Sequence, residues 1–71
     1  MEITKALAAL RPLYGKSNIE IVTDEGNSFR GTIRSMKMTQ ALTRPSVKVE
    51  LDGGQVEKIF VESIVKIIDH N

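Results

Sequence analysis

The chain of 71 residues contains no cysteine and no tryptophan, and it has one histidine. The missing cysteine excludes disulfides and thiolate–metal sites, so neither can supplement the small core that a chain of this length can bury. Self-association is the remaining way to enlarge that core. His70 stands next to the last residue, and a lone imidazole in a terminal segment is more often solvated than catalytic.

The sequence also lacks the motifs and segments that catalysis or membrane insertion requires. The sequence has no His-x-x-x-His pair, no paired-carboxylate spacing and no glycine-rich phosphate loop, so we expect a binding protein with no enzymatic activity, metal or cofactor. No stretch approaches the roughly 20 apolar residues of a membrane span. The first ten residues lack the ordered regions of a signal peptide. These features predict a cytoplasmic protein without a membrane partner.

The net charge of +1 hides an uneven distribution. Residues 26–49 contain five cations and no acid, whereas the rest of the chain contains five cations and nine acids. A local positive field attracts phosphates or an acidic protein, although basic residues on a strand also discourage edge-to-edge aggregation. The candidate phosphate contacts are Arg30, Arg34, Lys37, Arg44 and Lys48.

The first segment has the pattern of a short amphipathic helix. Ile3, Leu7 and Leu10 recur at the spacing of one helix face, and the alanines between them favour helix. Pro12 disfavours helical geometry at the residue before it. We therefore predict a helix over about residues 2–10 that closes one open end of the core.

From residue 18 onward the apolar residues alternate, which predicts strands over 18–23, from 28, and over 47–51, 56–61 and 64–68. Strict alternation in the second strand places inward the residues Phe29, Gly31, Ile33 and Ser35, and outward the residues Arg30, Thr32, Arg34 and Met36. An inward Gly31 indicates a bend or a close backbone approach. The whole pattern predicts one mainly β domain over residues 1–71, a short helix followed by a strongly bent five-stranded antiparallel barrel over about residues 18–68.

Two segments resemble the signatures of the Sm-like family of small SH3-like barrels. Residues 26–33 (GNSFRGTI) resemble the first signature, and residues 59–67 (IFVESIVKI) resemble the second. The resemblance implies the barrel fold and a place among RNA-binding proteins. Lys37 and Ala41 stand where Sm-like RNA binders carry an acid and an asparagine, so the resemblance implies phosphate contacts rather than a base-reading pocket.

A second resemblance is to the C-terminal SH3-like domain of bacterial ribosome maturation factors. It is carried by residues 14–16 (YGK), 19–22 (IEIV), 29–33 (FRGTI), 47–53 (VKVELDG) and 64–67 (IVKI). This likeness implies docking on ribosomal components. The N-terminal domain of that family has no counterpart in these 71 residues, so the implied function is a general ribonucleoprotein-docking or protein-docking module.

Two functions therefore stay open. The first is binding of RNA or a ribonucleoprotein through the basic second strand and the loop after it, with Tyr14 as a candidate stacking platform unless it packs against the helix; Phe29 and Phe60 are expected in the core. The second is a protein–protein or regulatory module. Its candidate contacts are Met36, Met38 and Leu42 in the irregular stretch 36–46, which alternatively cap the core. A homo-oligomer could pair through a strand edge at Ile59, Phe60 and Val61.

Overall fold

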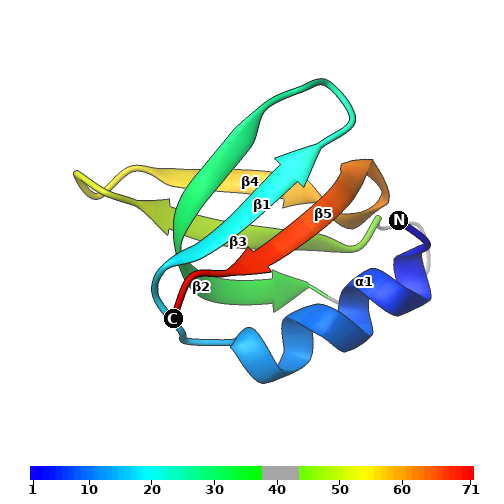
Figure 1. Cartoon of the computed structure of the whole chain (residues 1–71), viewed down its shortest axis with the longest axis horizontal. Coiled ribbons are helices and arrows are strands. Elements are labelled where there is room, and N and C mark those ends of the chain that lie inside the picture. The colour runs from blue at the N-terminus through cyan, green and yellow to red at the C-terminus, as the bar shows by residue number, and fades with distance from the viewer. Residues whose placement is uncertain (38–43) are drawn as a thin grey trace.

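The computed structural model describes residues 1–37 and 44–71 of the chain (Figure 1). Its helix α1 (Ile3–Leu10) leads through a 3₁₀ turn, η1 (Arg11–Leu13), into the strands. The strands are β1 (Ile19–Thr23), β2 (Ser28–Lys37), β3 (Ser46–Leu51), β4 (Val56–Phe60) and β5 (Ile64–Asp69), with a second 3₁₀ turn, η2 (Val61–Ser63), between the last two. The predicted helix and the five predicted strands are confirmed.

All five strands belong to one antiparallel sheet, in the order β4-β3-β2-β1-β5. The fold is therefore mainly β, as predicted. The sheet is strongly curved (Figure 1), yet within residues 1–37 and 44–71 its two outermost strands, β4 and β5, do not pair with each other. The sheet is accordingly not closed into a barrel.

The longest strand, β2, bends so that its first half pairs with β1 and its second half with β3 (Figure 1). Gly31 lies at the junction, opposite both Ile19 and Leu51. A Cβ atom at Gly31 would lie 2.0 Å from the backbone carbonyl oxygen of Glu50, far inside van der Waals contact. The close backbone approach predicted at Gly31 is confirmed.

A β-bulge in β2 corrects the predicted alternation. The register with β3 shifts between Ile33 and Ser35, so one extra residue, Arg34, lies on the outer side. Each residue after a bulge changes face. Met36 consequently packs against the core, while Ser35 and Lys37 lie on the outer face of the sheet. The prediction for Phe29, Gly31 and Ile33 was right, and that for Ser35 and Met36 was wrong.

The core lies between α1 and the concave face of the sheet. Its buried residues are Ala6, Leu10, Ile19, Ile21, Ile33, Val47, Val49, Ile59, Val61 and Ile64. The helix contacts β5 and η2, and the N-terminal amino group donates a hydrogen bond of 2.9 Å to the carbonyl oxygen of Ile64. In the described ranges no helix is both long and apolar enough to cross a membrane.

Candidate functional site

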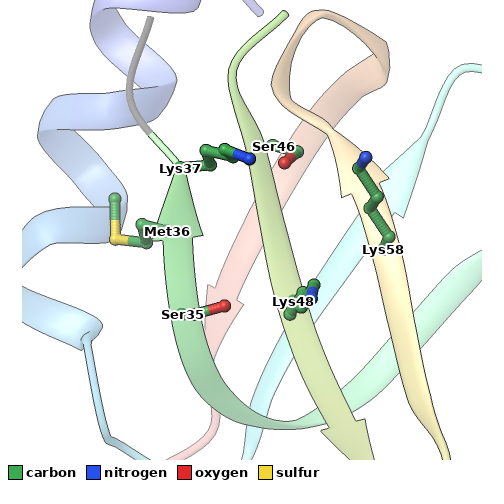
Figure 2. Close-up of a pocket in the computed structure, with 6 residues that line it drawn as sticks. All are labelled: Ser35, Met36, Lys37, Ser46, Lys48 and Lys58. Atoms are coloured by element: carbon green, nitrogen blue, oxygen red, sulfur yellow. The ribbon is translucent and has the colours of Figure 1, made fainter. Parts of the chain in front are cut away.

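A hollow of about 260 Å³ lies on the outer face of β2, β3 and β4. We call it the lysine pocket. It is lined by Ser35, Met36, Lys37, Ser46, Lys48 and Lys58 (Figure 2). Figure 2 shows the Lys37 side chain extending toward Ser46, whereas Met36 points away toward α1. The polar part of the lining is thus three ammonium groups and two hydroxyls.

Strand register brings these side chains together from three separate parts of the chain. Ser35, Lys48 and Lys58 form one row across β2, β3 and β4, and Lys37 and Ser46 begin the next row. Neighbouring strands lie about 4.8 Å apart, so the row places Lys48 and Lys58 directly opposite each other. Like charges in that position oppose folding. Among the described residues no carboxylate lies within ion-pair distance of any of the three lysines, which leaves the pocket strongly positive.

The two arginines nearest the lysine pocket are ion-paired. The Arg34 Nε donates a hydrogen bond of 2.6 Å to the Glu50 carboxylate, and Arg44 pairs with Glu62. The five cations predicted as phosphate contacts are therefore divided. Lys37 and Lys48 line the pocket, whereas these two arginines are partnered to acids.

Arg30 is the remaining predicted contact, and it lies on the other side of the bend in β2. It is paired in register with Glu20 of β1, away from the lysine pocket. The predicted basic cluster is consequently not one continuous patch. Lys58 is the pocket cation that sequence reasoning missed, because it lies among the acids outside residues 26–49. The hairpin of β3 and β4, with its turn at residues 52–55, places Lys58 opposite Lys48. Pairing the two strands across this turn in the sequence could have identified Lys58.

Phe60 does not belong to the core, which corrects a prediction. Alternation in β4 buries Ile59, at 4% exposed, and turns Phe60 outward, opposite Ser46. The Arg44 guanidinium lies over the Phe60 ring, 3.9 Å from its centroid, and the Lys58 ammonium is 5.1 Å from the same centroid. An aromatic ring therefore adjoins the lysine pocket.

The other candidates from the sequence fall in different places. Ile59 and Val61, predicted at a self-association edge, are core residues, so that edge could offer only backbone groups and Phe60. Met36 takes the alternative role of covering the core. Met38 and Leu42 lie outside the described residues. Tyr14 is 58% exposed and does not line the lysine pocket.

The last three residues form a second polar cluster, which we call the C-terminal clasp: Asp69, His70 and Asn71 bound to residues 16–20 of the chain. The His70 backbone N–H donates to the Asn18 carbonyl oxygen at 3.0 Å, and the Asn71 amide donates to the Ser17 carbonyl oxygen at 2.8 Å. His70 is therefore held in place, where the sequence suggested a free tail.

Two carboxylates of the C-terminal clasp have a lowered pKa. The His70 Nε2 lies 2.7 Å from the Glu20 carboxylate, and this hydrogen bond lowers the pKa of Glu20 below its ordinary value. Hydrogen bonds from the Asn71 backbone and side chain, followed by the contact with Lys16, lower the pKa of Asp69. Both carboxylates are thus stabilised in their charged form.

Within the part of the chain that the structure describes, no group of three or more His, Cys, Asp or Glu side chains is placed to hold a metal ion. Comparison of the chain with protein-family models, curated proteins and solved structures finds no match.

Proposed function

We propose that this protein is a small, non-enzymatic module of the Sm-like, SH3-like type that binds RNA or a ribonucleoprotein through phosphate contacts. The observation that carries the proposal is the lysine pocket, where Lys37, Lys48 and Lys58 meet without a carboxylate among the lining residues. The proposal includes the cytoplasmic location inferred from the sequence, with ribosomal components among the candidate partners.

The chemistry of the lysine pocket suits a phosphate group. Each lysine is a flexible point charge with three donors, and the hydroxyl of the half-buried Ser35 supplies a further donor to phosphate oxygens. A flexible ammonium carries no fixed pattern for reading base edges. We therefore propose contacts to the RNA backbone and little dependence on base sequence, in agreement with Lys37 and Ala41 at the positions where Sm-like RNA binders carry their base-reading acid and asparagine.

The proposal is tested by removing the three pocket charges and comparing an equal change elsewhere. The test variant is Lys37→Gln/Lys48→Gln/Lys58→Gln, and the control is Lys5→Gln/Lys16→Gln/Lys66→Gln, which alters three exposed lysines outside the pocket. Fluorescence anisotropy with a labelled single-stranded RNA, repeated over a salt series, gives both affinity and salt dependence. Loss of three phosphate contacts should reduce the slope of log affinity against log salt by about 2.

We expect the test variant to bind at least about tenfold more weakly than the control variant. Equal losses in the two variants would show that net charge, and no particular site, governs binding. A wild-type protein that binds no RNA at low salt would refute the proposal altogether.

A second candidate function is protein interaction, including assembly of a homo-oligomer, through the open edges of the sheet. In the described ranges the outer edges of β4 and β5 pair with no other strand, and Val56 and Val65 on these strands are 54% and 48% exposed. An open edge presents N–H and C=O groups that another strand can pair with. Sedimentation velocity over a range of concentrations tests this, and a monomer at every concentration would contradict self-association.

A further inference from the structure

Phe60 occupies an unusual environment for an aromatic residue in so small a protein. It is half-buried on the outer face of β4, is not among the residues that pack against the core, and lies beside two cations, Arg44 and Lys58. Lys58 also lines the lysine pocket. The ring therefore lies beside the pocket, and Lys58 is next to both.

We propose that Phe60 is a stacking platform for a nucleobase, and that the ligand of the lysine pocket is consequently a single-stranded polynucleotide. This inference rests on the proposed function and adds that the bound nucleic acid is single-stranded. In it, successive backbone phosphates contact Lys37, Lys48 and Lys58 while a neighbouring base lies on Phe60.

The spacing of the two subsites fits one polynucleotide. Lys58 and Phe60 are two residues apart on the same face of β4, which corresponds to about 6.8 Å along a strand. In the adjoining row, Phe60 is directly opposite Ser46, a buried residue that also lines the pocket. Proteins that bind single strands combine such a positive groove with aromatic rings on which bases stack, and this stacking tolerates any base. The bases of a duplex are already stacked and cannot reach the ring.

Arg44 covers the Phe60 ring, and it can leave at little cost. Its side chain is 60% exposed and that of its partner Glu62 is 47% exposed, so solvent screens their ion pair strongly. A guanidinium also stacks on bases. Arg44 can therefore turn from the ring to the free face of a bound base, which would then lie between Arg44 and Phe60.

The test combines Phe60→Leu, which keeps an apolar side chain but removes the ring, with an oligodeoxynucleotide that carries abasic sites in place of its bases. Binding is measured by fluorescence anisotropy for single-stranded RNA, single-stranded DNA, duplex RNA and the abasic strand. We expect Phe60→Leu to weaken single-strand binding about 5- to 150-fold, the range that one stacked base contributes. Its affinity for duplex RNA and its salt slope should stay at the wild-type values.

The abasic strand separates stacking from a loss of structure. The wild-type protein should lose about as much affinity on removal of the bases as on Phe60→Leu, and the variant should lose nothing further on the abasic strand. Phe60→Tyr keeps the ring and should bind as the wild type does. Tyr14→Leu, which removes an exposed ring outside the pocket lining, should also leave binding unchanged.

Each outcome has a distinct meaning. If Phe60→Leu binds single strands as tightly as the wild type, or weakens single-strand and duplex binding equally, the stacking platform is refuted while the phosphate pocket stands. If the wild-type protein binds none of the four nucleic acids, the proposed function fails with it. Equal effects on RNA and DNA would support a platform that takes any single strand; a larger effect on RNA would support one that takes RNA in particular.

Discussion

The lysine pocket and the C-terminal clasp lie on opposite sides of the bend in β2, and they treat charge in opposite ways. In the clasp each carboxylate faces a hydrogen-bond donor: the Lys16 Nζ is 3.4 Å from the Asp69 carboxylate, and the His70 Nε2 is 2.7 Å from the Glu20 carboxylate. In the pocket, Lys48 faces Lys58 across two strands. The contacts of the clasp join the chain end to β1. The facing lysines of the pocket, by contrast, disfavour the folded state, and they gain a favourable partner only when an anion binds.

The ion pairs next to the lysine pocket show which cations are available to bind an external anion. Arg34 precedes Ser35 in β2 and Arg44 lies over the Phe60 ring. Arg34 is paired with Glu50, and Arg44 is paired with Glu62. Arginine suits such pairs because its planar fork matches a carboxylate. The arginines thereby neutralise the acids nearest the pocket. Availability for an external anion thus depends on the partner of each cation as well as on the number of cations along the sequence.

The largest expected effect on this arrangement comes from Gly31→Ala, because both regions depend on the bend in β2. The added Cβ would meet the Glu50 carbonyl oxygen at 2.0 Å, and backbone cannot move aside cheaply. We expect a loss of about 3 kcal/mol in the free energy of unfolding, at the upper end for overpacking, measured by urea denaturation. Since small domains are stable by about 5–15 kcal/mol, the variant should be partly unfolded on mild warming.

The matched control for Gly31 is Gly26→Asn in the turn between β1 and β2. Gly26 has φ +84°, and no atom lies within 4 Å of the position that a Cβ would take there. Asparagine tolerates that backbone conformation better than most residues, so the free energy of unfolding should fall by less than about 1 kcal/mol. If the two variants were equally stable, the bend would not depend on close contact at Gly31.

Sequence reasoning found the helix, the five strands and the special position of Gly31, because each has a local cause. Apolar spacing fixes the helix face, and alternation marks a half-buried strand. The β-bulge at Arg34 has no such local signal. It arises where β2 must pair with β3 on one side while bending around the core, and it moves Lys37 onto the face of Lys48 and turns Met36 inward.

The candidate site was predictable only in part for the same reason. Lys37 and Lys48 belong to the basic segment of the sequence, but the third pocket lysine, Lys58, lies in the acidic remainder. Phe60 was expected in the core because the run Ile59–Val61 is apolar throughout, yet the period of two in a strand turns its middle residue outward. Counts of charge and hydrophobicity along the chain do not contain this cross-strand information.

The contrast between paired and unpaired cations can be tested at Glu50. Glu50→Gln removes the partner of Arg34 and leaves a cation beside the lysine pocket. Single-stranded RNA affinity should rise several-fold, and the slope of log affinity against log salt should steepen by about 0.7, the value for one additional phosphate contact. Glu57→Gln, on the neighbouring strand, makes the same change of net charge and serves as the control. Equal gains in the two variants would contradict a specific role for the pairing.

A smaller effect is expected on stability when the facing lysines are separated. Lys48→Thr removes the like-charge pair with Lys58 and places a β-branched residue in the middle of β3. We expect the free energy of unfolding to rise by about 0.5 kcal/mol, the scale of one cross-strand pair, while RNA affinity falls. Urea denaturation at low and high salt checks the cause, because screening should reduce the gain. A variant less stable than the wild type would show that the facing lysines do not oppose folding.

The smallest effect is expected in the C-terminal clasp and depends on pH. The hydrogen bond from His70 lowers the pKa of Glu20 below its ordinary value of 4.5, so the charged carboxylate favours the folded state. That contribution is complete above pH 4.5 and is lost as the pH falls through the lower folded-state pKa. Glu20→Gln should therefore be slightly less stable than the wild type near neutral pH, and the difference in urea midpoint should vanish in acid.

Glu25→Gln, in the exposed turn between β1 and β2, is the control for Glu20→Gln and should show a smaller change with pH. A difference in stability between wild type and Glu20→Gln that stayed constant down to acid pH would mean that the clasp contact is not electrostatic.

The RNA affinities of Glu20→Gln and Glu50→Gln compare the two regions directly. Because Glu20 lies across the bend from the lysine pocket, Glu20→Gln should leave the affinity near the wild-type value, whereas Glu50→Gln, with the same change of charge, should raise it.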